Sequence, residues 1–531
     1  MALPATVPIS NISNSHRTRA KFNDLAADEL VFAVVGPVGS GTTFVADALE
    51  RLVASQFEGS KIHRIKVSQI IEKSIDSSEL DRLKAGSRLR RATAFQDAGD
   101  GLRAGDEAAL AVRIAEIIKE KRDKPDDVSA VTRIKEEKSK PLTVHIVDSL
   151  KHPTEVELLR GLYREAFCLI GVVCEESTRL SRLREKKCSD SSTDEIKSFM
   201  RRDENEEGKK HGQKVSETFH LADFFVDNTP SRLTDDSKEN PEWNVADKLG
   251  RLIDILGGKK IIRPDASETG MFHAVGAQFR SACLSRQVGA ALVDQSGSVI
   301  STGTNEVPAA GGGVYGFNFE SGDGSGMEIP DHRCFSTNRY CSNNREQSAI
   351  IAEVISAIPE LNQAADPSKV ANQLKGTALG RLLEFSRAVH AEMDALLTAA
   401  RKGMSTVGTK LYVTTFPCHY CARHIVTAGV EEVQYIEPYP KSKALSLHSD
   451  AIHQIAKGWK SPQKGRDGKV LFRPFTGVAP RLYRRAFMKD RKLKDESGGL
   501  SISEPLWVSG LMRDSYTSLE AHVIEAHRVE D

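Results

Sequence analysis

The chain has 531 residues, of which 39% are hydrophobic and 28% are charged. This length is too great for one ordinary hydrophobic core and predicts two domains, and the composition is typical of a globular protein. Lys plus Arg (74) nearly balances Asp plus Glu (73), so the global charge gives no sign of a nucleic-acid or acidic-membrane partner.

Residues 1–27 are rich in Ser, Asn and Pro and lack the apolar core of a signal peptide, which predicts a flexible N-terminal arm. No apolar run of the sequence approaches the roughly 20 residues that span a bilayer. Eight cysteines in so long a chain are not a disulfide framework. We therefore expect a cytoplasmic protein without a membrane partner.

The first half of the chain alternates strand and helix patterns. Apolar runs at 30–35, 143–147 and 168–173 predict buried strands, and charged stretches such as 108–122 predict the helices between them. This alternation predicts an α/β fold with a doubly wound, three-layer domain over residues 28–260.

A Gly-rich turn follows the first strand and opens a helix predicted from residue 43 to about 53. A turn in this context is typical of a P-loop, whose backbone N–H groups bind phosphate at a helix N-terminus. Asp148, at the end of a strand, fits the acid of a Walker B motif, so a nucleoside triphosphate with Mg²⁺ is the predicted ligand. The other candidate nucleotide-binding residues are Gly36, Gly39, Ser40, Gly41, Thr42 and Thr43.

The loop departs from the P-loop pattern at Thr42, which stands where a lysine should contact the β- and γ-phosphates. Without that charge, phosphoryl transfer should be weak. Three alternatives follow: a nucleotide sensor without turnover, a structural loop that binds nothing, and a working kinase with a cation supplied from elsewhere. The charge-dense segment Ser189–Lys214 is either a solvated helix or an arginine-bearing lid over the phosphates.

The second domain is predicted over residues 264–531. It contains strand patterns at 288–293, 298–302, 410–414 and 433–436, with a helix at 385–402 and another that starts at Pro417-Cys418. Residues 309–380 are predicted to be an insertion, Gly-rich at first and then helical.

Two short motifs of this domain carry metal chemistry: His390-Ala391-Glu392, and Pro417-Cys418-His419-Tyr420-Cys421. Their spacing, H-x-E with P-C-x-x-C, is the published pattern of zinc deaminases. One imidazole and two thiolates hold Zn²⁺ well and leave a fourth position for water. Two cysteines three apart at a helix start lie on one side of its first turn. His390, Cys418 and Cys421 are thus the predicted zinc ligands.

Glu392 is the predicted catalytic acid and base. Zinc lowers the pKa of a bound water to about 7, and a nearby carboxylate must take the released proton and return it to the substrate. The alternative is a closed zinc knuckle with a fourth protein ligand, for which His419, His424, Cys334 and Cys341 are available. Cys334 and Cys341 with His332 could also form a second zinc site, although packing or loop cysteines are favoured.

On these residues, the second domain resembles the cytidine and deoxycytidylate deaminases and is expected to have their α/β/α fold. Ser281–Ala290 resembles the opening helix and first strand of that family. Gly303-Thr304-Asn305-Glu306-Val307-Pro308 falls at its substrate-contacting turn, so the resemblance implies that Asn305 contacts substrate. Thr304 and Glu306 depart from the family's tyrosine and glycine there.

As a whole, the chain resembles bacterial anti-phage dCTP/dCMP deaminases, in which an N-terminal P-loop domain similar to nucleoside monophosphate kinases precedes the deaminase domain. The segments Glu437–Ser442 and Phe475–Arg481 carry part of this likeness. The resemblance implies hydrolysis of dCTP and dCMP to dUTP and dUMP, which depletes the deoxycytidine pool during infection. It further implies a homo-oligomer and an inactive resting state, held in some systems by an inhibitory small non-coding RNA.

Three alternatives stay open at this point. A polynucleotide-editing deaminase would need aromatic stacking and a basic channel, whereas aromatic residues are 6% of this chain. A housekeeping dCMP deaminase would supply dUMP. A binding module with a vestigial site is disfavoured by the intact set His390, Glu392, Cys418 and Cys421. Lys441 and Arg481 are candidate contacts for substrate phosphate, and the basic cluster 481–494 permits an RNA contact.

Overall fold

The computed structural model shows two compact units. Unit 1 comprises Met1–Arg263 together with Thr476–Asp531, and unit 2 comprises Pro264–Phe475. The predicted N-terminal arm, residues 1–27, lies outside the described residues. The structure describes residues 28–530 apart from 58, 124–141, 187–190, 207–208, 233–237, 239, 259, 317–330, 338, 364–365, 383–384, 440, 466, 490–492 and 502–512. Among the described helices, none combines the length and apolarity that crossing a bilayer requires.

Unit 1 is built on one six-stranded sheet with the order β12-β5-β4-β1-β3-β2, in which the first five strands of the chain run parallel. The strands are β1 (Glu29–Val35), β2 (Lys61–Lys66), β3 (Thr143–Asp148), β4 (Phe167–Val173), β5 (Phe224–Asp227) and β12 (Gly477–Val478). Every residue of β1 and β4 is buried, as their continuous apolar sequences predict for central parallel strands. The predicted α/β alternation of the first half is therefore present.

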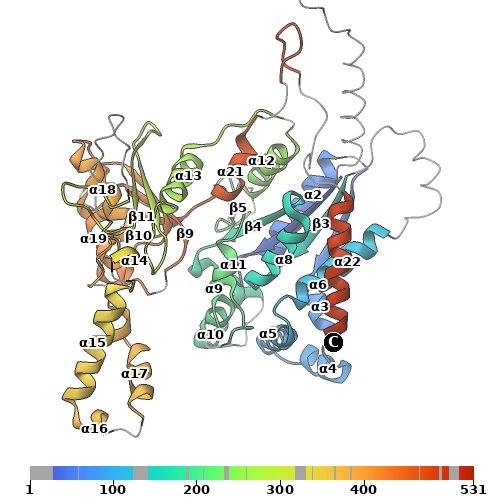
Figure 1. The fold of residues 1–531 in the computed structure, drawn as a ribbon. Helices are drawn as coiled ribbons and strands as arrows, with labels where there is room; N and C mark the ends of the chain where they lie inside the picture. The colour runs from blue at the N-terminus through green and yellow to red at the C-terminus, as the bar shows by residue number, and fades with distance from the viewer. Residues whose placement is uncertain are drawn as a thin grey trace, which may run out of the picture. The chain divides into compact units, whose positions relative to one another are not determined.

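The helices of unit 1 connect and cover these strands. Figure 1 labels most of them. Their bounds are α2 (Thr42–Gln56), α3 (Val67–Glu72), α4 (Ser77–Ala85), α5 (Arg88–Gly105), α6 (Ala109–Asp123), α8 (Pro153–Tyr163), α9 (Glu176–Lys186), α10 (Thr193–Glu204), α11 (Val215–Phe219), α12 (Val245–Gly257), α21 (Pro480–Phe487) and α22 (Arg513–Glu530), with a 3₁₀ turn η2 (Arg164–Ala166). The charge-dense segment predicted as a helix or lid contains α10.

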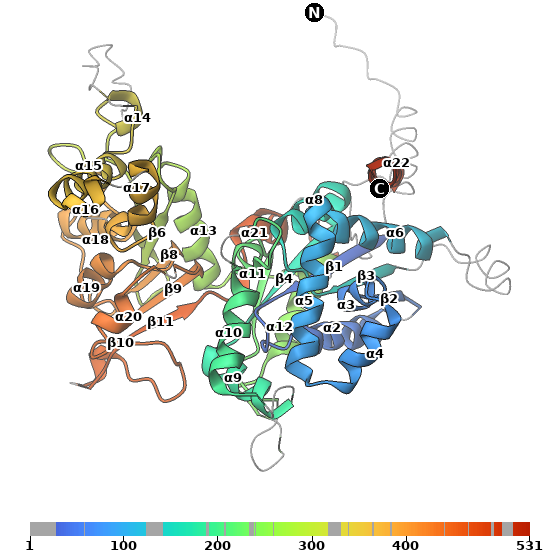
Figure 2. The same cartoon turned by 90° about the horizontal axis from the view of Figure 1, so that it is seen from below.

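The C-terminal segment belongs to unit 1, whereas the sequence placed it in the deaminase domain. β12 pairs antiparallel with β5. α22 packs on α6 and α8 (Figures 1 and 2). Glu29 of β1 and Glu520 of α22 both bind the guanidinium of Arg122, at 3.0 and 2.6 Å, and Tyr516 donates a hydrogen bond to Glu29. Because these partners are hundreds of residues apart, no local pattern could reveal that the chain returns to its first domain.

Unit 2 contains a second six-stranded sheet with the order β10-β11-β9-β8-β6-β7. β7 and β8 each pair antiparallel with β6, and β8, β9, β11 and β10 run parallel. The strands are β6 (Gly289–Val293), β7 (Val299–Thr304), β8 (Lys410–Thr415), β9 (Glu432–Glu437), β10 (Ile452–His453) and β11 (Val470–Pro474). The four strands predicted in this region all form.

Two glycines let helices approach opposite faces of this sheet. A Cβ on Gly289 would lie 1.9 Å from the carbonyl oxygen of Ala274 in α13 (Ala266–Gln278). A Cβ on Gly303 would lie 2.1 Å from the carbonyl oxygen of Ala391 in α18 (Ala391–Arg401). Gly303 pairs with Ala290, so its face of the sheet is opposite to the face of Gly289. The result is a three-layer α/β/α arrangement in which α18 is pressed closely onto β7.

The remaining helices of unit 2 include those of the predicted insertion. The bounds are α13 (Ala266–Gln278), α14 (Cys334–Thr337), α15 (Ser342–Ala357), α16 (Pro359–Asn362), α17 (Pro367–Lys375), α18 (Ala391–Arg401), α19 (His419–Thr427) and α20 (Ala444–Leu447), with 3₁₀ turns η3 (Leu379–Arg381) and η4 (Pro462–Lys464). α15 packs on α16 and α17. Two predictions were wrong in position: α18 begins at Ala391 rather than near 385, and the opening helix ends at Gln278, before Ser281.

Candidate functional site

His390 is held at the start of α18, where the helix meets the edge of a pocket. It is the N-cap residue with an extended backbone, and its carbonyl accepts the hydrogen bond from the Asp394 N–H at 2.9 Å. Val389, just before it, forms an antiparallel bridge with Glu306. The close packing of α18 on Gly303 fixes the height of this helix start above the sheet. The imidazole is therefore positioned by backbone contacts on both sides.

Cys418 and Cys421 lie at the start of α19, directly after β8. Cys418 is the N-cap residue, and its Sγ accepts a hydrogen bond from the Cys421 N–H at 3.5 Å. Both cysteines are buried in the core beneath the helix. A hydrogen bond from the Cys421 thiol, helped by one from His390, lowers the pKa of the Cys418 thiol to about 4, which favours the thiolate that binds metal.

The three side chains converge on one point. The Nδ1 atom of His390 lies 3.4 Å from the Cys418 Sγ and 3.3 Å from the Cys421 Sγ. All three ligand atoms lie within 4.8 Å of one another. Tetrahedral zinc with usual bond lengths of about 2.0 Å to nitrogen and about 2.3 Å to sulfur would separate such atoms by about 3.5 Å. The donor set and its spacing fit zinc without rearrangement.

Within the described part of the chain, no further His, Cys, Asp or Glu joins this group of three ligand atoms. A closed zinc knuckle would need a fourth. His424 lies outside the group, its Nδ1 hydrogen-bonded to the Tyr420 carbonyl at 2.6 Å. The described residues also show no second cluster around Cys334 and Cys341; Cys341 Sγ instead lies 3.4 Å from Ser285 Oγ. The site is thus of the open kind, with room for a water or substrate atom.

Glu392 lies in the first turn of α18, two residues after His390, and is 4% exposed. Burial raises the pKa of its carboxyl group to about 7. Glu392 and His390 open, with Cys418, into a pocket of about 320 Å³. A buried carboxyl beside a metal site has the placement that general acid and base catalysis requires.

Asn305 and Lys441, two of the candidate substrate contacts, also line this pocket. The Asn305 amide is hydrogen-bonded to backbone at both ends: its Oδ1 accepts from the Val288 N–H at 2.6 Å, and its Nδ2 donates to the Arg286 carbonyl. It therefore shapes the 286–288 turn at the pocket rim. Arg481 does not line this pocket and lies on α21, a helix of unit 1.

Glu306 replaces the family's small residue for a structural reason. Its carboxylate accepts hydrogen bonds from the N–H groups of Ala282, at 2.7 Å, and Val307, at 2.9 Å. It thus ties the turn after β7 to the segment that precedes β6.

The Gly-rich loop of unit 1 borders a larger pocket, of about 1020 Å³, at the carboxyl ends of the parallel strands. Gly36, Gly39, Gly41, Thr42 and Thr43 line it, as does Asp148, whereas Ser40 is buried beneath it. Gly41 caps α2 with a left-handed backbone (φ 86°) and no side-chain cap, so the first N–H groups of the helix face no capping side chain. Such an edge is where open α/β sheets bind ligands.

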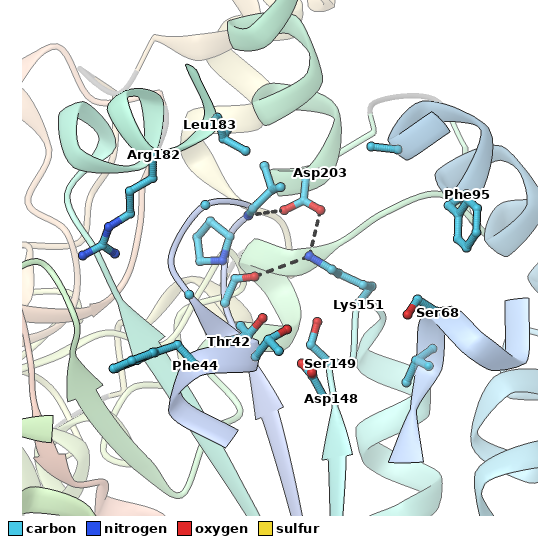
Figure 3. Close-up of a pocket in the computed structure, with 18 of the residues that line it drawn as sticks. Thr42, Phe44, Ser68, Phe95, Asp148, Ser149, Lys151, Arg182, Leu183 and Asp203 are labelled. Carbon is cyan, nitrogen blue, oxygen red and sulfur yellow. Dashed lines mark hydrogen bonds and ion pairs between the residues drawn. The ribbon is translucent and has the colours of Figure 1, made fainter. Parts of the chain in front are cut away.

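The sequence missed two residues that line this pocket, Lys151 and Asp203, and a third, Arg64, that binds one of the lining residues. Arg64 of β2 binds the carboxylate of Asp148 at 2.8 Å. Lys151 lies 2.8 Å from Asp203, whose other oxygen accepts the hydrogen bond of the Val38 N–H at 2.7 Å (Figure 3). Lys151 follows β3 by three residues and Asp203 lies in the last turn of α10, so neither belongs to the loop motif. The position of Lys151, just past a strand that ends beside the loop, is the one signal that could have found it.

Comparison with known proteins locates the family of the chain. The family pattern described as the zinc-binding region of cytidine and deoxycytidylate deaminases matches residues 265–437. The deoxycytidylate deaminase of Enterobacteria phage T2 is 30% identical over 166 residues, which are 31% of this chain and 75% of the phage protein. The chain belongs to the cytidine and deoxycytidylate deaminase family. It is accordingly a zinc-dependent hydrolytic deaminase.

Two further relatives accompany this match. The deoxycytidylate deaminase of Enterobacteria phage T4 is 30% identical over 166 residues, 31% of this chain and 73% of the phage protein. The crystal structure of the dCMP deaminase from cyanophage S-TIM5 has 19% identity and a TM-score of 0.21, over 40% of this chain and 99% of that one. The family match ends at residue 437 and leaves the described strands of unit 1 outside it.

Proposed function

We propose that the chain hydrolyses deoxycytidine nucleotides, dCMP, dCTP or both, to the corresponding deoxyuridine nucleotides. The observation that carries this is the convergence of His390, Cys418 and Cys421 with one open position beside the buried carboxyl of Glu392. Support for the substrate class comes from the relatives named above, whose names specify deoxycytidylate.

The proposed residue roles follow from position. His390, Cys418 and Cys421 would hold zinc, which when bound lowers the pKa of a water molecule to about 7. Glu392 takes a proton from the attacking water and delivers it to N3 of the cytosine ring. It then passes the second proton to the amino group, which leaves C4 as ammonia, so that one water is consumed and a C4 carbonyl remains. Burial of Glu392 keeps these protons from exchanging with bulk solvent.

Substrate orientation is assigned to the pocket rim. Asn305 holds the 286–288 turn that faces the base, and its pocket-lining position makes it the proposed substrate contact. Lys441, on the same rim, is placed to meet a substrate phosphate. The rim therefore offers one polar contact for the nucleoside and one cation for the phosphate.

A substrate panel tests the proposal. Zinc-loaded protein is incubated with dCMP, dCTP, CTP, cytidine and a cytosine-containing oligonucleotide, and ammonia and uracil products are measured for each. We expect turnover of deoxycytidine nucleotides alone, lost in Glu392→Ala with zinc retained. Turnover of the oligonucleotide alone would make the chain an editing enzyme, and exclusive use of dCMP would favour a supply role for dUMP over pool depletion.

We further propose that the Gly-rich loop of unit 1 is a P-loop that senses a nucleotide without turning it over. Gly36, Gly39, Gly41, Thr42 and Thr43 line a pocket of nucleotide size, with Ser40 beneath and Asp148 opposite. Thr42 supplies no cation, and Asp148 is already paired with Arg64. We expect ATP or another nucleoside triphosphate with Mg²⁺ to change the deamination rate while its own hydrolysis stays at the background level. Steady hydrolysis would make unit 1 a working enzyme instead.

In the cell, we propose that this activity depletes deoxycytidine nucleotides during phage infection, in a cytoplasmic homo-oligomer restrained by a small RNA. The support is the likeness of the whole chain to anti-phage deaminases, in which a P-loop domain precedes the deaminase. Infected cells that express the wild-type chain should lose dCTP and yield fewer phage than cells that express Glu392→Ala. Equal dCTP pools in the two would contradict a defence role.

A further inference from the structure

The large pocket of unit 1 extends well beyond the Gly-rich loop. It is lined by α2 and the loop at one end and by residues of α3 and α5 at the other. Figure 3 shows Phe44 and Phe95 on opposite sides of Lys151, so the pocket has two ends with the lysine between them. Six basic side chains line it against four acidic ones, which favours an anionic ligand. Its volume of about 1020 Å³ matches the upper range of small-molecule sites.

At the loop end, an acidic side chain occupies a place suited to an anion. The Asp203 carboxylate accepts the Val38 N–H at 2.7 Å with one oxygen and lies 2.8 Å from the Lys151 Nζ with the other. The same Nζ donates to the carbonyl of Gly36 at 3.4 Å. One backbone N–H of the loop and one ammonium group therefore already converge on a pair of carboxylate oxygens. A phosphate group presents the same oxygen geometry with greater charge.

At the other end, a buried amide lines the pocket without any partner. Gln96 of α5 is 8% exposed, and among the described residues neither its Oε1 nor its Nε2 has a hydrogen-bond partner. Arg103, 1% exposed and on the same helix, is already partnered: its Nε binds Glu155 at 2.8 Å and its Nη1 lies 3.6 Å from the Asp100 carboxylate. Burying an amide with no partner costs free energy, so such groups are rare unless a ligand or water satisfies them.

An amide offers one donor and one acceptor side by side, which is the pattern that the edge of a nucleobase presents. Phe95, next to Gln96, lies in the same pocket and supplies an aromatic ring, with the guanidinium of Arg91 5.4 Å from its centre. Aromatic rings and guanidinium planes stack on bases. The α5 end of the pocket thus combines an amide that can hydrogen-bond to a base edge with an aromatic ring on which a base can stack.

We propose that this pocket binds a nucleoside phosphate lengthwise, with its phosphates at the Gly-rich loop and Lys151 and its base against the Gln96 amide. Lys151 then supplies the cation that Thr42 does not. The phosphate displaces the Asp203 carboxylate from Lys151 and Val38, which couples binding to the end of α10. This inference rests on the proposed nucleotide binding at the Gly-rich loop and adds to it the cation, the base contact and the orientation of the ligand.

Calorimetric titration of the full, zinc-loaded chain, in a buffer that contains Mg²⁺, tests this proposal. The probes are ATP, GTP and dTTP, which carry no cytosine for the deaminase site to hydrolyse, and inorganic tripolyphosphate, which carries no base. We expect one of the nucleotides to bind more tightly than tripolyphosphate. Gln96→Met should weaken that nucleotide about tenfold and leave tripolyphosphate unchanged, because only the base contact is lost. Lys151→Met should weaken both about tenfold.

The matched control is Gln69→Met, an exposed glutamine on α3 outside the pocket, which should bind every probe as the wild type does. Gln96→Met replaces an unpartnered buried amide with an apolar chain, so its thermal unfolding should occur at or above the wild-type temperature. If Gln96→Met binds the nucleotide more weakly but unfolds at no lower a temperature, the loss of binding is due to the missing base contact and not to a damaged fold.

Three results would overturn the inference in different ways. Equal nucleotide affinity of Gln96→Met and wild type would mean that Gln96 contacts only water, and nucleotide binding at the loop would stand without it. Failure of the wild type to bind tripolyphosphate or any nucleotide would contradict the P-loop assignment itself, and the lengthwise pocket with it. Nucleotide binding that is insensitive to Lys151→Met would place the ligand outside this pocket.

Discussion

The two pockets of this chain are assembled in different ways. In unit 2, three metal ligands and a buried carboxyl come from two helix starts within 32 residues of sequence, each held by a strand or turn next to it. In unit 1, the loop is continuous, but Lys151, Asp203 and Gln96 arrive from three separate elements. A site built from two helix starts that are close in sequence can be recognised in the sequence, whereas a site built across sheet crossovers cannot.

The largest expected effect breaks the unit 2 site itself. Cys421→Ala removes one of two thiolates from a buried donor set, so zinc content should fall from about one per chain to near zero and deamination with it. Metal analysis and a dCMP assay on the same sample measure both. The control is Cys174→Ala, a cysteine of unit 1 outside the metal group, which should keep zinc and activity. Retained zinc in Cys421→Ala would contradict the assigned ligands.

The contact that positions α18 gives the next effect. Gly303→Ala places a Cβ 2.1 Å from the Ala391 carbonyl oxygen and 2.3 Å from the Ala395 nitrogen, both backbone atoms that cannot turn aside. We expect a loss of about 2–4 kcal/mol in the free energy of unfolding of unit 2, which denaturant unfolding measures. The deamination rate should also fall, because His390 and Glu392 lie at the start of this helix.

Gly276→Ala is the matched control for this strain. A Cβ on Gly276, within α13, meets no atom within 4 Å, so alanine there should leave the fold intact and stabilise the helix by about 0.5–1 kcal/mol. Equal stability of the two variants would show that α18 does not need the close approach to β7.

The metal site and the start of α18 differ in how far the sequence predicts them. His390, Glu392, Cys418 and Cys421 were predicted because metal chemistry constrains residue type and spacing within single turns. Strand patterns predicted β1, β3 and β4 of unit 1 and β6 to β9 of unit 2, whereas β2, β5, β10, β11 and β12 were not predicted. The start of α18 was placed too early because its true N-cap, His390, is not a favoured capping residue and has no side-chain cap hydrogen bond.

The sequence did not predict the contacts between residues that are far apart along the chain. The C-terminal segment was assigned to the deaminase domain because it follows it in order, yet β12 pairs with β5 and Glu520 binds Arg122 of unit 1. Lys151 and Asp203 likewise meet only after α10 returns to the loop. Single charged residues in charged helices carry no pattern that distinguishes such a partner from a solvated side chain.

Lowering the pH should reduce the free energy of unfolding of unit 1, because Glu29 becomes protonated. Burial alone would raise the pKa of this carboxyl, but the hydrogen bond from His145 and the charge of Arg122 outweigh it and lower the pKa to about 2. A lowered pKa contributes stability above the ordinary value of 4.5, and this stability is lost as pH falls towards 2. Between pH 6 and pH 3.5 the expected loss is about 1.4 kcal/mol.

Denaturant unfolding of unit 1 at the two pH values measures this loss. Glu29→Gln has no charge to titrate, so the free energy of unfolding should change less with pH in this variant than in the wild type, by about the same 1.4 kcal/mol. Parallel pH profiles of the two proteins would mean that Glu29 does not anchor the C-terminal helix by charge.

The smallest expected effect is a gain rather than a loss, and it concerns phosphate binding in the unit 1 pocket. Asp203→Asn removes the negative charge that holds Lys151 and the Val38 N–H, so tripolyphosphate should bind about fivefold more tightly, roughly 1 kcal/mol. Calorimetry of wild type and variant measures this. A damaged fold would weaken binding, so only a gain supports the view that Asp203 occupies the phosphate position.

The central claim is that Glu392 moves protons at a zinc site formed by His390, Cys418 and Cys421. Its most direct test measures zinc content and the deamination rate of dCMP and dCTP on the same preparations of wild type and Glu392→Gln. We predict about one zinc per chain in both proteins and a rate in the variant lower by about 10²–10⁴-fold. Full deamination by zinc-loaded Glu392→Gln would contradict the proton-transfer role and, with it, the proposed mechanism.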